Sequence, residues 1–78
     1  MNFNKIDISK VDISKLSLAL ISLSAKMKDG DQYAVLEDGT VFDINVGGIQ
    51  IGEMKFMVDE WDVVDEEKNE VMLHLVQV

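Results

Sequence analysis

The sequence predicts an α+β domain in which one N-terminal helix, about residues 13–28, packs on a four- to five-stranded antiparallel sheet. An apolar stripe at helical spacing occupies the first third of the chain, and the period of the apolar residues changes to two from residue 32 onward. Asp38-Gly39, between two alternating runs, indicates a hairpin. A chain of 78 residues has room for one domain with a modest core. We therefore expect residues 1–78 to form a single domain, with 1–11 as an extended arm or edge strand, 12–29 as the helix and 32–78 as a β-meander.

The helix prediction rests on apolar residues spaced alternately three and four apart, namely Ile13, Leu16, Leu20, Leu23 and Met27. Asp12 or Ser14 can serve as N-cap, Lys26 and Lys28 suit the negative end of the helix dipole, and Gly30 can end the helix. A second apolar strip consists of Leu18, Ile21 and Ala25. A helix that is apolar on two sides is either wrapped by its own sheet or shared with a second subunit, so a homodimer is one expectation.

The N-terminal third also contains a repeat of five residues, Ile6-Asp7-Ile8-Ser9-Lys10 followed by Val11-Asp12-Ile13-Ser14-Lys15. This register resembles the pentapeptide-repeat family, whose quadrilateral β-helix can imitate duplex DNA. The resemblance covers only the first third of the chain, and stacked repeats need several neighbours to bury a core. Bulky residues also stand where that family prefers small ones, namely Ile6, Val11, Leu16 and Ile21. The helix is the better-supported interpretation.

The rest of the chain alternates with period two and predicts strands. Asp38-Gly39 favours a tight turn because its central positions require positive φ. Gly47-Gly48 permits a second reversal, and Gly52 is a candidate bulge. The expected elements are strands at Gln32–Glu37, Thr40–Val46, Ile49–Val58, Trp61–Val64 and Val71–Val78, with an acidic loop at Asp65–Asn69.

Charge is the most informative property of the composition. The formal net charge is −8, with +3 in residues 1–28 and −11 in residues 29–78, and the chain contains no arginine. Such a body repels phosphates and lacks the usual bidentate reader of bases, which argues against direct nucleic-acid binding. Attraction to a basic protein surface, such as that of a nuclease or another nucleic-acid-binding complex, is physically favoured.

One segment combines the carboxylates with the single tryptophan. As an interaction patch, its acids would steer a basic partner and the indole would anchor it. The alternative is a core tryptophan flanked by a solvated acidic loop. The candidate partner-binding residues are Asp59, Glu60, Trp61, Asp62, Asp65, Glu66, Glu67 and Glu70.

The motifs do not indicate an enzyme, a cofactor or a metal. Trp61 and Val63 occupy positions where an EF-hand loop needs oxygen ligands, so that calcium motif is rejected. One histidine and no cysteine exclude a Cys/His zinc site. His74 alternates with apolar residues of a predicted strand, and we expect a surface or hydrogen-bonded strand histidine rather than a general base. Gly47–Gly52 lacks the lysine and the helix of a phosphate-binding loop.

The sequence thus predicts a small non-enzymatic protein-binding module, most simply an inhibitor that covers a basic, nucleic-acid-binding surface. In size and charge it is similar to the small acidic inhibitors that phages direct against host nucleases and CRISPR complexes, although it matches none of their motifs. The alternatives are an oligomeric small-ligand binder, with its site near Trp61 and Gly47–Gly48, or a structural subunit of a larger complex. The chain contains no run of about 20 apolar residues and no signal peptide, so we expect a cytoplasmic protein without a membrane partner.

Overall fold

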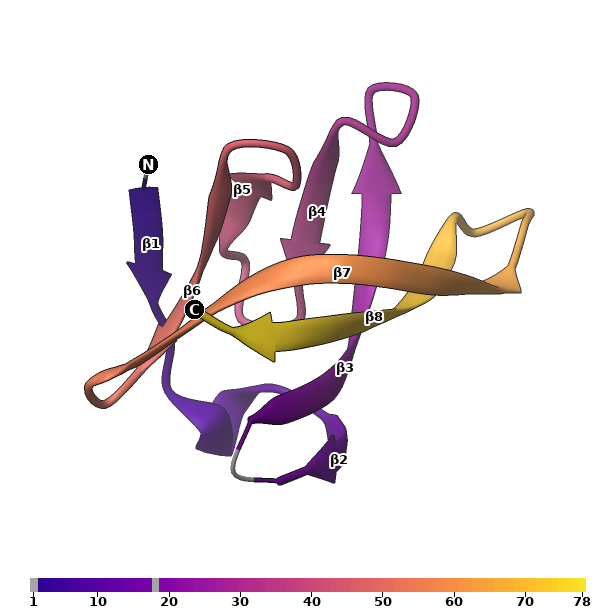
Figure 1. The fold of residues 1–78 in the computed structure, drawn as a ribbon. Coiled ribbons are helices and arrows are strands. Elements are labelled where there is room, and N and C mark those ends of the chain that lie inside the picture. The colour runs from indigo at the N-terminus through magenta and orange to yellow at the C-terminus, as the bar shows by residue number, and fades with distance from the viewer. Residues whose placement is uncertain (1, 18) are drawn as a thin grey trace.

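A computed structural model describes residues 2–17 and 19–78 and shows a protein built almost entirely from β-strands (Figure 1). In these residues the chain forms no α-helix, and a single 3-10 turn, η1, covers Ile8–Lys10. The strands are β1 Asn2–Lys5, β2 Ile13–Leu16, β3 Leu20–Lys28, β4 Tyr33–Leu36, β5 Val41–Asp43, β6 Gly47–Ile51, β7 Met54–Asp65 and β8 Glu70–Gln77.

These strands form one strongly curled sheet. Its order is β1-β6-β7-β8-β3-β4-β5, and β2 pairs with β3 beside this path. β1 runs parallel to β6, while the other pairs are antiparallel. A short turn at residues 44–46 brings the end of β5 beside the start of β6, so the sheet closes almost into a barrel (Figure 1).

The predicted N-terminal helix is wrong, and with it the α+β class, because the segment forms β2 and β3. The apolar residues of this segment fit two periods. Between Ile21 and Lys28 they alternate strictly with serine and lysine, and the structure buries Ile21, Leu23, Ala25 and Met27 on the inner side of β3. A strand directs successive side chains to opposite faces, so β3, paired on both sides, buries the apolar residues and leaves the serines and lysines on the other face. A helix would not separate the two kinds of residue in this way. Leu18, from the second strip of the helix prediction, lies outside the described residues.

Several predicted strands and turns are confirmed, although their boundaries differ. β4 and β5 form the expected hairpin, but the connection between them covers four residues, 37–40, and only Gly39 has a positive φ there, at +91°. The predicted strand Ile49–Val58 is divided by a turn into β6 and β7, so Gly52 begins a hairpin turn at φ +59° rather than a bulge. The reversal expected at Gly47-Gly48 occurs just before them, and both glycines belong to β6.

The core lies between the curled halves of the sheet and is entirely apolar. Phe56 on β7 and Ile49 on β6 are fully buried, and alternate residues of β3 and β8 are buried in the same cluster. The buried hydrophobic residues are Ile21, Leu23, Ala25, Met27, Ala34, Leu36, Phe42, Ile44, Ile49, Phe56, Val71, Leu73 and Leu75. The side chains between them on β3 and β8 point outward and form the exterior face described below.

The close packing of β6 makes a stability prediction. A Cβ atom on Gly48 would overlap the carbonyl oxygen of Phe56 and lie 3.0 Å from the Phe3 ring. Because a paired backbone cannot move away, we expect Gly48→Ala to lower the free energy of unfolding by about 3 kcal/mol in urea titrations. Gly30→Ala is the control, because Gly30 has open space around it at φ +66° and should cost only about 1 kcal/mol. Equal losses in the two variants would contradict this packing.

Candidate functional site

The predicted partner-binding residues all lie in the hairpin of β7 and β8. We call residues 59–70 of this hairpin the acidic ribbon; it forms one end of the molecule (Figure 1). The ribbon contains seven carboxylates and one lysine, so its formal net charge is −6. Most of these acids are exposed, while Asp65 and Glu70 are half-buried. The structure therefore brings together the acids that the sequence analysis selected.

Two bulges in β7 decide which way the ribbon's side chains point. The register with β8 shifts between Val58 and Glu60 and again between Val63 and Asp65, so that Asp59 and Val64 are the extra residues. After the first bulge, Glu60 lies opposite His74, and Asp62 lies opposite Met72. Because these β8 residues alternate with the buried residues of β8, the carboxylates share the exterior face. The bulges thus gather Glu60, Asp62, Asp65 and Glu70 on one side of the ribbon.

The other side of the ribbon is apolar. Trp61 lies opposite the fully buried Leu73, and Val63 lies opposite Val71. The indole is half-buried and packs against the core, which agrees with the interpretation of Trp61 as a core residue. Val63, on this side near the tip, is 57% exposed, and Val64, the extra residue of the second bulge, is 63% exposed and lines the groove on the exterior face described below. The ribbon therefore offers aliphatic surface beside its carboxylates.

Asp65 has a structural role at the tip. Its Oδ1 accepts hydrogen bonds from the backbone N–H groups of Glu67, at 3.0 Å, and Lys68, at 3.3 Å. Asn69 then adopts φ +55°, and its carbonyl accepts a hydrogen bond of 2.9 Å from the backbone N–H of Met27 on β3. The acidic loop that the sequence predicted at Asp65–Asn69 is therefore a defined turn tied to β3.

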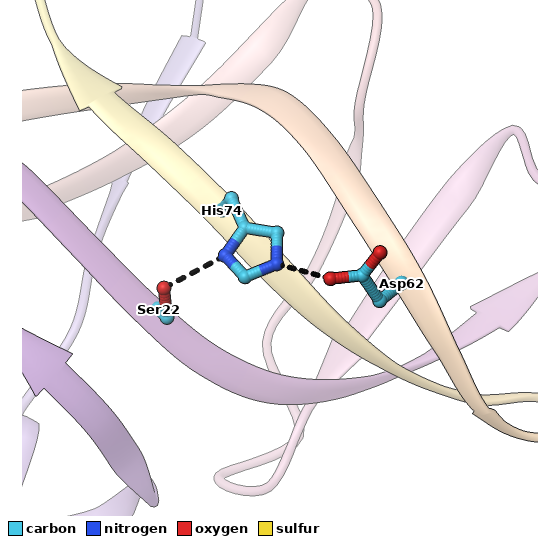
Figure 2. A network of polar contacts seen from close by, with 3 residues as sticks. All are labelled: Ser22, Asp62 and His74. Carbon is cyan, nitrogen blue, oxygen red and sulfur yellow. Dashed lines mark hydrogen bonds and ion pairs between the residues drawn. The ribbon is translucent and has the colours of Figure 1, made fainter.

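A polar chain that the sequence analysis did not predict crosses three strands on the exterior face (Figure 2). The hydroxyl of Ser22 on β3 lies 2.8 Å from His74 Nδ1 on β8, and His74 Nε2 lies 2.7 Å from Asp62 Oδ2 on β7. Ser22 is only 8% exposed, whereas the Asp62 side chain is 77% exposed. One neutral tautomer satisfies the histidine fully, because Nε2–H donates to the carboxylate and Nδ1 accepts from the serine.

The geometry of the polar chain formed by Ser22, His74 and Asp62 indicates a structural role. Ser22 lies in the middle of β3, where its backbone is within the ladder between β2 and β8. The hydroxyl that a nucleophile would need is therefore buried under its neighbours. The chain connects the acidic ribbon to β3, so it holds the carboxylate of Asp62 in a fixed position. This agrees with the expectation of a hydrogen-bonded strand histidine.

A groove of about 460 Å³ lies along the exterior face. It begins at the outward-facing pair of the β3–β8 ladder that follows Ser22 and His74. Ser24 and Met72 face each other across β3 and β8, and Lys26 faces Glu70. The other lining residues belong to β3, β7 and β8 and to β4 with the residue after it. They are Ala25, Val35, Leu36, Glu37, Val64 and Val71. Neither Trp61 nor Gly47–Gly48 lines this groove.

Two further observations concern metal sites and membrane-spanning helices. Among residues 2–17 and 19–78, no three histidine, aspartate or glutamate side chains are grouped closely enough to hold a metal ion. The same residues include no helix that is long and apolar enough to cross a membrane. Hydrogen bonds from Ser9 lower the pKa of Asp7, and the backbone N–H of Asn45 lowers the pKa of Asp43, and both carboxylates lie outside the ribbon.

A comparison of the chain with protein-family models, curated proteins and solved structures finds no match.

The polar chain makes a prediction that separates it from its surroundings. Ser22→Ala removes the hydroxyl beside His74 Nδ1 and should lower the free energy of unfolding by about 1–2 kcal/mol. Ser24→Ala, two residues along the same strand, should change it by less than about 0.5 kcal/mol. Nitrogen-15 NMR should show neutral His74 with its proton on Nε2. A proton on Nδ1, or equal effects of the two serine variants, would show that the hydrogen bonds of the polar chain are not formed.

Proposed function

We propose that this protein is a non-catalytic binding module whose acidic ribbon occupies a basic surface on a partner protein. The observation that carries the proposal is the pair of bulges in β7, which turn Glu60, Asp62 and Asp65 to the same side as Glu70. A strand without bulges would alternate, and the same residues would be divided between the exterior and the core. The local order of the ribbon therefore favours a single negative face.

The neighbouring charges support this proposal. Lys68 is the only lysine in the ribbon, and Lys26 faces only one end of it. Within the described residues, Asp62 Oδ2 accepts a hydrogen bond from His74 Nε2. The other carboxylates are left to repel one another, which costs folding free energy. An opposite surface would relieve that repulsion on binding, and long-range attraction would speed the encounter.

The partner class follows from the same chemistry. A face of closely spaced carboxylates suits lysine- and arginine-rich surfaces, and the proteins richest in these surfaces bind nucleic acids. A nuclease or another nucleic-acid-binding complex is therefore the partner class we propose, with the protein acting as an inhibitor that competes with the nucleic acid. In this proposal the protein itself contacts neither nucleic acid nor membrane.

The test compares two triple variants that remove equal charge. Glu60→Gln, Glu66→Gln and Glu67→Gln neutralise the ribbon but leave the turn of Asp65 and the polar chain of Asp62 intact. Asp12→Asn, Asp29→Asn and Glu53→Gln neutralise three exposed acids elsewhere. Partners are captured from a cell lysate, identified, purified and titrated against both variants by calorimetry. We expect the ribbon variant to bind about tenfold more weakly and the control variant to change affinity less than about threefold.

Salt provides an independent measurement on the same partner. The Debye length falls from about 14 Å to about 4 Å between 50 and 500 mM salt, so affinity should fall steeply over that range. Equal weakening in the two triple variants, or an affinity that ignores salt, would refute the proposed function. Displacement of nucleic acid from the partner by the unmodified protein, and not by the ribbon variant, would identify the inhibitory role.

A further inference from the structure

The acidic ribbon has a backbone edge that no described strand pairs with. β6 pairs with β7 only from Gly48 opposite Met57 to Ile51 opposite Met54. β7 then continues to Asp65, and from residue 58 onward it pairs with β8 alone. We call the backbone of residues 58–65 on the side away from β8 the open edge. Figure 1 shows this edge of β7 running clear of β6.

From this geometry we infer that the open edge takes up an extended, lysine- or arginine-rich segment of the partner as an additional β-strand. The inference rests on the proposed function, because it specifies how the acidic ribbon meets its basic partner. In an edge strand, alternate residues direct their N–H and C=O groups outward, where they are ready to pair with another chain. Addition of a strand would satisfy these groups and continue the sheet.

The side chains along the open edge select the charge of the added strand. Residues 58–65 carry the four carboxylates of Asp59, Glu60, Asp62 and Asp65 and no basic residue. Opposite charges on neighbouring strands stabilise pairing, and like charges oppose it. Val63 and Val64, which are more than half exposed, would be covered by the alkyl stems of lysine or arginine. Both the charged and the apolar parts of such side chains therefore have matching surface.

A second copy of this chain is a poorer occupant. Pairing one open edge with another would place the four carboxylates of each copy side by side, and no basic residue of either edge could offset them. Edge carboxylates of this kind also prevent sheets from joining one another in general. The carboxylates of the open edge therefore repel a second copy of this edge and attract a strand that carries lysine or arginine.

The experiment uses a capped, fluorescent peptide of about seven residues that alternates lysine and valine, a length that matches the open edge. Binding to the full chain is followed by anisotropy, and amide hydrogen exchange is read residue by residue by NMR. Strand addition should slow exchange about tenfold at the amides of residues 58–65 that face away from β8, with no comparable change in β1 or β5. A peptide that alternates glutamate and valine should not bind.

Two matched variants then locate the contact. Asp59→Asn with Glu60→Gln removes two charges at the open edge, and Glu66→Gln with Glu67→Gln removes two at the tip. We expect the first pair to weaken peptide binding about fivefold and the second to weaken it less than twofold. Equal weakening by both pairs would overturn the inference.

The outcomes separate this inference from the proposed function. A peptide that binds and is weakened by neutralising the ribbon, but leaves the amides of residues 58–65 unprotected, overturns strand addition and leaves the electrostatic proposal standing. A peptide that binds equally well after the ribbon is neutralised contradicts both. Protection of the same amides in the free protein that grows with protein concentration would show that a second copy occupies the edge, and would also overturn the inference.

Discussion

The pairing of β3 with β8 is the interaction on which the rest of the structure depends. It joins residues 20–26 to residues 70–76, so the first third of the chain meets the last. One side of this ladder contributes the fully buried Leu23 and Leu73 to the core. The other side aligns Ser22 with His74 and Ser24 with Met72 on the exterior. A slip of one residue would exchange these two sides, so burial of the core also fixes the register of the exterior face.

The acidic ribbon depends on that register and on the two bulges of β7. The half-buried Trp61 opposite Leu73 sets the inward positions at the base of the ribbon, and the neighbouring Glu60 and Asp62 must then point outward. The bulge at Val64 repeats this adjustment and brings Asp65 to the outer side, where it can close the turn at the tip. The hydrogen bond between Asp62 and His74 fastens the ribbon to the central ladder. The electrostatic surface is therefore a consequence of how the core is covered.

The position of the carboxylates could be predicted from the sequence, whereas β3, the polar chain and the bulges could not, and each failure has a physical reason. Acids that lie close together along a hairpin must lie close together in space, so the position of the carboxylates could be predicted locally. The helix prediction was wrong because Leu20, Leu23 and Met27 satisfy helical spacing, while the serines and lysines between the buried residues of β3 show the alternation of a strand. That strict alternation from Ile21 to Lys28 was the signal to weigh more heavily.

The polar chain could not be found in the same way. Ser22 and His74 are separated by 52 residues, and only the register of β3 with β8 places them opposite each other. A single serine beside a single histidine has no local signature, because pairing register is a property of the whole sheet. The bulges are hidden for the same reason, since each is a mismatch between two strands and neither strand shows it alone.

The open edge follows from the different lengths of the strands. β8 must reach Glu70 to cover β3, and β7 must follow it to Asp65 so that Trp61 and Val63 can shield the inner side. β6 begins only at Gly47, after the turn at residues 44–46, and it cannot extend further along β7. An unpaired edge is thus unavoidable in this topology, and an aliphatic edge would invite pairing with copies of the same chain. Carboxylates remove that hazard without removing the outward N–H and C=O groups, so the edge remains available to any strand that brings positive charge.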